Sequence, residues 1–187
     1  MPKTALVPVA DGSEEIEVVC IVDSLRRAGI DVTVASVMGR QQIVASRQTV
    51  LVADCLIGSC CDQTYDLVAL PGGMPGAEHL HDDPYVRTLL IEQRAANRAI
   101  GAICAAPAVV LLPLGLLRGY GATCFPSFLP ALREAEGVLA LEDRVVVDRE
   151  LITSRGPGTA IEFALKLVEH LLDAKAAASI GERMLVK

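Results

Sequence analysis

The sequence has no excess of positive charge and no apolar run long enough to cross a membrane. Its 17 Lys and Arg residues are outnumbered by 23 Asp and Glu, which gives a net charge of −6. Because these acids are spread along the chain, they argue against a nucleic-acid or anionic-membrane surface. The first residues, Met1-Pro2-Lys3, lead into a strand-like segment rather than a secretory leader. We therefore expect a cytoplasmic protein whose partners are small molecules or proteins.

Metal-binding and disulfide patterns are also missing. The six cysteines form no Cys-x-x-Cys pair, and a long, core-rich chain favours reduced thiols over a disulfide framework. Cys60 and Cys61 are adjacent, and neighbouring cysteines bridge only with backbone strain, so an ordinary loop pair is expected there. His79 and His81 are two apart, which places them on different faces of a helix and disfavours a zinc pair. We expect no metal and no cofactor.

The apolar segments that are present predict one α/β domain over residues 1–187. With 52% hydrophobic residues, the chain can fill a single core and is short for two domains. Strand and helix patterns alternate with short loops, which predicts a three-layer α/β/α sandwich around a mostly parallel sheet. The main predicted strands are 3–9, 30–37, 66–70, 98–104, 144–148 and 151–154, with two short pieces within 44–54, and the main predicted helices are 14–28 (with Ser13 as N-cap), 83–96, 105–112 and 158–173.

Cys104 lies where an apolar strand pattern changes to a helical one. Pro107 falls in the first turn of the predicted helix, where its missing N–H costs little. A side chain on such a strand-to-helix turn projects from the sheet, and the N–H groups that open the helix favour a thiolate. The alternative is a small buried cysteine with a packing role only. We predict that Cys104 is a nucleophile.

Two further segments end at the same edge of a parallel sheet. The strand before Gly72-Gly73 ends in a bare backbone that can offer N–H groups to an oxyanion. The helix that begins near Ser13 carries Glu17 among apolar neighbours, and burial would keep this acid protonated as a donor to Cys104. The alternative for Glu17 is a solvated partner of the helix dipole, which is the role expected of Glu14 and Glu15.

Six segments together resemble the ThiJ/PfpI superfamily, in particular its Parkinson-disease-associated deglycase branch. They are Asp11-Gly12-Ser13-Glu14-Glu15-Ile16-Glu17, Leu25-Arg26-Arg27-Ala28-Gly29-Ile30, Ser46-Arg47, Leu70-Pro71-Gly72-Gly73, Ala102-Ile103-Cys104-Ala105-Ala106-Pro107 and 152–159. The resemblance implies a flavodoxin-like sandwich of the class I glutamine amidotransferase type and a homodimer. It also implies Cys104 as the oxidation-sensitive nucleophile, Glu17 as its protonated donor, and oxyanion donors at Gly73 and Ala105.

The same resemblance suggests a function in the detoxification of reactive dicarbonyls, of glyoxalase or deglycase type, without a cofactor and with a role in oxidative stress. Arg27, Arg47 and Gly72 are candidate pocket or anion contacts. Phe125 stands where several relatives carry a histidine, which disfavours a Cys-His mechanism. The alternative is a non-enzymatic redox sensor or redox-regulated chaperone that uses the same cysteine.

Overall fold

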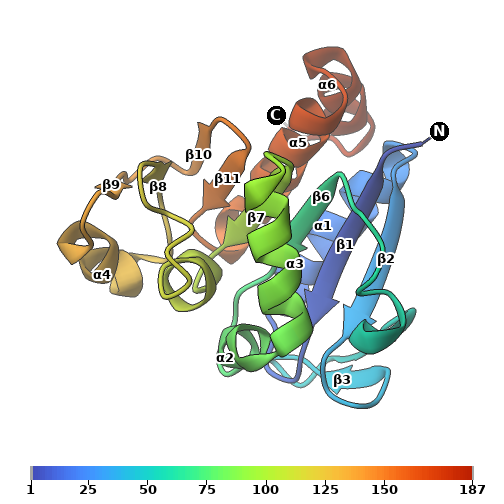
Figure 1. Ribbon diagram of the computed structural model, residues 1–187. Coiled ribbons are helices and arrows are strands. Elements are labelled where there is room, and N and C mark those ends of the chain that lie inside the picture. Colours follow the sequence, from blue (N-terminus) through green and yellow to red (C-terminus); the bar gives the residue numbers. More distant parts are fainter. Residues whose placement is uncertain (1, 187) are drawn as a thin grey trace.

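Seven strands form the central sheet of the computed structural model, which describes residues 2–186 (Figure 1). Their order is β10-β11-β7-β6-β1-β2-β5, and all neighbours are parallel except β10 and β11. The strands are β1 (Thr4–Val9), β2 (Asp31–Ser36), β5 (Cys55–Leu56), β6 (Leu67–Leu70), β7 (Ala99–Ile103), β10 (Val145–Asp148) and β11 (Leu151–Ser154).

Helices cover both faces of this sheet, which confirms the predicted three-layer sandwich. Helices α2 and α3 lie on one face, while α1 and α5 lie on the other with α6 beside α5 (Figure 1). The helices are α1 (Glu15–Arg27), α2 (Gly76–Asp82), α3 (Pro84–Ala95), α4 (Leu129–Glu134), α5 (Ala160–Leu171) and α6 (Ala174–Arg183). Among residues 2–186, no helix combines the length and apolarity needed to cross a bilayer.

Alternation along the central strands divides the interior into two cores. In β1, Leu6 belongs to the core beneath α2 and α3, whereas Ala5 and Val7 belong to the core beneath α1 and α5. The neighbouring strand β6 divides in the same way, with Val68 on the first side and Leu67 on the second. Because successive residues of these strands enter opposite cores, every buried position must be apolar, as expected for a parallel strand that is buried on both faces.

The shorter elements lie outside the central sheet. Residues 42–52 form the predicted excursion, an antiparallel hairpin of β3 and β4, and two short strands, β8 and β9, pair in parallel. These elements are β3 (Gln42–Val44), β4 (Val50–Val52), β8 (Gly121–Ala122), β9 (Leu139–Ala140) and the single-turn helices η1 (Ile57–Ser59), η2 (Pro107–Leu111), η3 (Pro126–Phe128) and η4 (Pro157–Thr159).

Two local predictions are wrong. Ser13 does not cap α1: its hydroxyl accepts the N–H of Ala10 at 3.0 Å, and the residue at the cap position is Glu14. The expected regular helix after Cys104 is a five-residue π-helical turn, in which the N–H of Leu112 donates to the carbonyl of Pro107, 2.9 Å away and five residues back. A turn with this five-residue spacing is wider than a turn of α-helix.

Candidate active site

Cys104 follows β7 directly and sits on a strained turn. Its φ of +64° lies in the left-handed region that residues other than glycine rarely adopt. Two distant segments hold this backbone in place: the N–H of Cys104 donates to the carbonyl of Ser154 at 3.0 Å, and its carbonyl accepts the N–H of Phe125 at 2.8 Å. The turn is therefore fixed by β11 on one side and by the chain after β8 on the other.

Glu17 lies in the first turn of α1 and is completely buried. One carboxyl oxygen, Oε2, accepts the backbone N–H of Gly72 at 2.7 Å. The other, Oε1, is buried with no hydrogen-bond partner among residues 2–186, and the Cys104 thiol lies near this carboxyl group. A buried acid with a free oxygen is stabilised when that oxygen carries a proton and donates it.

Backbone N–H groups from two loops reach the sulfur of Cys104. They belong to Gly73, after β6, and to Ala105, the next residue along the turn. The approach of these two loops requires glycine at position 72, because an added Cβ would lie 2.6 Å from the Cβ of Cys104 and 2.9 Å from the nitrogen of Ala105. Gly73 has a φ of +84°, so its backbone also favours glycine.

Burial controls the protonation of this acid–thiol pair. It raises the pKa of Glu17 from 4.5 to about 7, although the Gly72 N–H and the Cys104 thiol oppose the shift. Burial and the charge of Glu17 raise the pKa of Cys104 to about 12, against the N–H groups of Gly73 and Ala105. Coupled groups share their protons, so between these two values the pair holds one proton and one negative charge.

The expectation of a readily formed thiolate therefore needs correction. Cys104 is only 9% exposed, and the short turn that follows it supplies too little favourable charge to offset its burial beside Glu17. A thiolate is favoured only when the shared proton resides on Glu17, which removes the neighbouring negative charge. The Cys104 thiol and the Glu17 carboxyl group consequently titrate as one unit.

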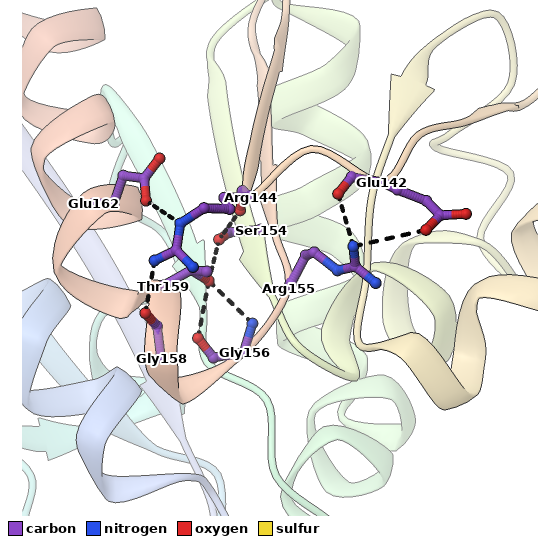
Figure 2. Close-up of polar contacts among 8 residues, drawn as sticks. All are labelled: Glu142, Arg144, Ser154, Arg155, Gly156, Gly158, Thr159 and Glu162. Atoms are coloured by element: carbon purple, nitrogen blue, oxygen red, sulfur yellow. Dashed lines mark hydrogen bonds and ion pairs between the residues drawn. The ribbon is translucent and has the colours of Figure 1, made fainter.

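The rim of the site is formed by the loop from Ser154 to Thr159, shown in Figure 2. Thr159 closes this loop by accepting the N–H of Gly156 at 3.1 Å and donating to its carbonyl at 2.9 Å. A Cβ on Gly156 would lie 3.2 Å from the ring of Phe125 and 4.0 Å from the sulfur of Cys104. The loop thus brings an aromatic edge close to the nucleophile.

A cavity of about 360 Å³ opens beside this loop, between Phe125 and two arginines. Arg144 donates to the Glu162 carboxylate at 2.7 Å and to the carbonyl of Gly158 at 2.9 Å, and Arg155 donates to the carbonyl of Glu142 at 2.7 Å (Figure 2). The cavity therefore has an apolar wall and a cationic wall. Its place next to Gly156 makes it a suitable entrance for a small polar molecule that must reach Cys104.

The other candidate contacts do not all come to this site. Arg27 lies ten residues beyond Glu17 on α1, about 15 Å along the helix axis, and its guanidinium donates to Asp23 at 2.6 Å. Arg47 is exposed in the β3–β4 turn, where its backbone N–H donates to the Glu15 carboxylate at 3.0 Å. The structure brings together Cys104, Glu17 and the loop at Gly72-Gly73, while Arg27 lies outside.

Glu14 and Glu15 do more than complement a helix dipole. The hydroxyl of Ser46 lies 2.6 Å from a carboxyl oxygen of Glu14 and 2.8 Å from one of Glu15, so the hairpin turn is attached to the start of α1. Burial acts to raise the pKa of Glu15, but hydrogen bonds from its own backbone, Ser46, Thr49 and Arg47 outweigh it and lower the value to about 2. This attachment keeps the first turn of α1, and hence Glu17, in place.

The sequence analysis did not assign Arg144, Arg155 or Gly156 to the site. The signal was present in the run Ser154-Arg155-Gly156-Pro157-Gly158, in which small residues follow a buried strand directly. Such a run leaves backbone exposed at the carboxyl edge of a parallel sheet, where ligands bind. Arg144 lies ten residues earlier and gives no comparable local signal.

Comparisons with known proteins identify the family of this chain. A sequence model of the DJ-1/PfpI family matches residues 3–170. Protein DJ-1 homolog B of Arabidopsis thaliana is 45% identical over 181 residues, which is 97% of this chain and 41% of that protein. The chain therefore spans less than half the length of this plant relative. The Parkinson disease protein 7 homolog of Danio rerio is 40% identical and is matched over 99% of this chain and 98% of its own.

A relative with a stated activity and a solved structure are also similar. The glutathione-independent glyoxalase DJR-1.2 of Caenorhabditis elegans is 38% identical over 166 residues, covering 89% of this chain and 86% of that protein. The structure of oxidized DJ-1 from Toxoplasma gondii superposes with a TM-score of 0.94 at 45% identity, covering 98% of each chain. On the extent of these matches, the chain belongs to the DJ-1/PfpI family.

Proposed function

We propose that the protein detoxifies reactive dicarbonyls by a glyoxalase or deglycase reaction that depends on Cys104 and needs no cofactor. The observation that carries this proposal is the buried Glu17, which has an oxygen without a hydrogen-bond partner, lies near the Cys104 thiol and has its pKa raised to about 7. An acid of this pKa both gives and takes a proton near neutral pH. The glyoxalase activity named for the C. elegans relative supports the same reaction class.

The proposed reaction converts methylglyoxal and water to lactate. The Cys104 sulfur adds to the aldehyde carbon, and the new alkoxide takes the proton of Glu17 to give a hemithioacetal. The Glu17 carboxylate then removes the hydrogen from that carbon and returns it to the neighbouring carbon, which converts the ketone to an alcohol and the adduct to a thioester. Water cleaves the C–S bond, releasing lactate and restoring the thiol.

The backbone donors have a defined role in this scheme. The N–H groups of Gly73 and Ala105 already point at the sulfur, so they also lie next to the oxygen that becomes charged when sulfur attacks. Fixed donors of this kind stabilise a developing oxyanion without having to reorganise. In the deglycase form of the reaction, the Cys104 sulfur displaces the amine or thiol from the former aldehyde carbon of an early glycation adduct: the C–S bond to Cys104 forms, the bond to the amine or thiol breaks, and the leaving group takes the proton of Glu17.

The deciding experiment measures methylglyoxal loss and lactate formation for the native protein and Cys104→Ala. We expect turnover in the native protein and none above background in the variant. Cys124→Ala is the matched control, because Cys124 is also buried and lies near the site in a different loop. Equal rates for native protein and Cys104→Ala would exclude the enzymatic function.

A second candidate function uses the same residues without turnover. A sulfinate formed at Cys104 by peroxide would accept the proton of Glu17 and the N–H groups of Gly73 and Ala105, which supports a redox sensor or a redox-regulated chaperone. The two functions differ in one measurement. A sensor gains mass at Cys104 in peroxide but consumes no dicarbonyl, whereas the enzyme consumes dicarbonyl catalytically.

We also propose that the protein acts as a cytoplasmic homodimer. Ile16 and Val19 of α1 are apolar, yet each is 51% exposed. A cavity of about 540 Å³ lies beside Ile16, between α1, α5 and the segment after α6, and Ile161 lines it as well. Exposed apolar side chains around a concave surface are typical of an interface between protein subunits.

A further inference from the structure

A second group of thiols lies at the far edge of the sheet from β10. Cys55 begins the edge strand β5 and pairs in register with Ala35 of β2. Cys60 directly follows the single-turn helix η1 and is buried, while Cys55 and Cys61 are partly exposed. All three cysteines are reduced, and none of them takes part in the chemistry proposed for Cys104.

The turn of η1 brings Cys60 back toward Cys55. The N–H of Cys60 donates to the carbonyl of Ile57 at 3.1 Å, and its sulfur lies 3.4 Å from that oxygen and 3.8 Å from the carbonyl oxygen of Leu56, the residue next to Cys55. Cys55 packs against the same hydrophobic cluster that contains Cys60, and its thiol lies close enough to Cys60 to raise the pKa of that thiol. Two thiols five residues apart in the sequence are therefore neighbours in the fold.

Cys61 points in a different direction. Its sulfur lies 3.6 Å from the carbonyl oxygen of Gly58 and 4.0 Å from the carboxylate of Asp62, beside a cavity of about 420 Å³. Cys60 is held in its own orientation by Tyr65, whose hydroxyl donates to the Cys60 carbonyl at 3.1 Å. The structure thus pairs Cys60 with Cys55 rather than with its neighbour in sequence.

Metal binding does not account for these thiols. Nowhere in residues 2–186 do three or more His, Cys, Asp or Glu side chains come together as a ligand set. Two adjacent thiols with no third ligand are suited instead to two-electron oxidation, because one sulfur can react with an oxidant and the other can then displace the oxygen.

We propose that Cys55 and Cys60 form an intramolecular disulfide when the protein meets a peroxide. The more exposed Cys55 attacks the O–O bond, so that an S–O bond forms, the O–O bond breaks and the leaving hydroxide takes a proton to become water. The Cys60 sulfur then attacks the sulfenic sulfur, forming the S–S bond and releasing a second water. The two thiols lose two electrons and two protons, and hydrogen peroxide is reduced to two waters.

The surroundings of the two sulfurs favour this order of events. Burial and the Cys55 thiol raise the pKa of Cys60 to about 11, so Cys60 remains a thiol while the accessible Cys55 reacts first. The sulfenic acid of Cys55 then forms near the Cys60 thiol. Fast capture of this kind keeps Cys55 from further oxidation to a sulfinic acid.

The test treats native protein and Cys104→Ala with stoichiometric hydrogen peroxide, blocks free thiols under denaturing conditions and measures the intact mass. In Cys104→Ala, whose reduced chain has five thiols, we expect a loss of two hydrogens and only three blocked thiols. The native chain, which has six, should lose the same two thiols in addition to any oxidation of Cys104. Chymotryptic cleavage after Leu56 separates Cys55 from Cys60, so their peptides should remain joined until a reductant is added.

Three variants assign the bond. Cys55→Ser and Cys60→Ala should each abolish the loss of two hydrogens, whereas Cys61→Ser, the matched control, should retain it. Because Cys60 is buried, its replacement can affect folding, and the partly exposed Cys55→Ser then decides the question by itself. Retention of the mass loss in Cys55→Ser, or oxygen addition at Cys55 without any bridge to Cys60, would overturn the proposal. Neither outcome depends on dicarbonyl turnover.

Discussion

At position 17, a glutamine keeps the size of the side chain and a hydrogen-bond donor but removes the ionisable group. We expect Glu17→Gln to bind dicarbonyl and to lower turnover by about 10²–10⁴-fold, the range associated with general acid–base groups. Initial rates over a range of substrate concentrations would measure both effects. Glu92→Gln is the control for the same change of side chain away from the site, since Glu92 is exposed on α3. Unchanged turnover in Glu17→Gln would exclude proton transfer by this residue.

The raised pKa of Glu17 also predicts how stability depends on pH. The folded protein holds this proton up to about pH 7, whereas the unfolded chain releases it near 4.5. The contribution of Glu17 to stability is therefore fully present below pH 4.5 and is lost as the pH rises toward 7, by about 3 kcal/mol at about 1.4 kcal/mol per pKa unit. Urea unfolding across this range should show a decline that Glu17→Gln lacks. A native protein that is equally stable throughout would contradict the shift.

A substitution at Gly72 tests how closely the loop at Gly72-Gly73 must approach the turn at Cys104. A methyl group there would overlap the Cβ of Cys104, so Gly72→Ala must displace the nucleophile or the loop that carries Gly73. We expect turnover to fall at least about 10²-fold, because small misplacements of reacting groups have effects of this size. Gly158→Ala is the control on the same rim, since its added Cβ would meet open space. Similar rates for the two variants would show that the site tolerates the displacement.

Helix α3 begins with a side-chain N-cap. The Asp83 carboxylate accepts the N–H of Val86 at 2.9 Å, and Pro84 follows as the first helical residue, within the helix predicted over 83–96. Replacing this cap leaves an N–H without its partner. We expect Asp83→Ala to lower the free energy of unfolding by about 1 kcal/mol, as measured by denaturant unfolding. Asp82→Ala, one residue away and exposed, should change it little.

The elements that the sequence predicted correctly are those with a strong local pattern. The strands at 67–70 and 99–103 are wholly apolar, and Asp83-Pro84 marks the start of α3 without ambiguity. The start of α1 was harder to predict, because Ser13 and Glu14 both fit a cap by residue type, and only tertiary contacts at Ala10 and Ser46 decide their roles.

Parts of the site could not be predicted from the sequence, because they too depend on tertiary contacts. The alignment of Glu17 with Cys104 followed from strand ends at one edge of the sheet, but the left-handed backbone of Cys104 depends on bonds to Ser154 and Phe125, which are far away in the chain. The raised pKa of Cys104 depends on the depth of its burial. Neither quantity has a signature in neighbouring residues.

For the whole molecule, the exposed side chains of α1 predict a dimer that a single charge should disrupt. We expect the native protein to sediment as a dimer at micromolar concentration and Val19→Asp to sediment as a monomer, because a carboxylate would be desolvated at the interface. Ile91→Asp is the matched control: Ile91 is 52% exposed on α3, on the opposite face of the sheet. A native protein that remains monomeric, or equal effects of both variants, would contradict an interface at α1.

Glu17 and Cys104 are far apart in the sequence, which suggests that the chain could be divided into two fragments that are active only when they reassemble. The exposed turn at Asn97 lies between β6 and β7, which are neighbours in the sheet, so a cut there would divide the sheet between two adjacent strands. One fragment would carry Glu17 and Gly72, and the other would carry Cys104. Neither fragment holds a complete catalytic unit. Dicarbonyl turnover on mixing would then count reassembled molecules, and tethering each fragment to one of two binding partners would convert their association into a chemical signal.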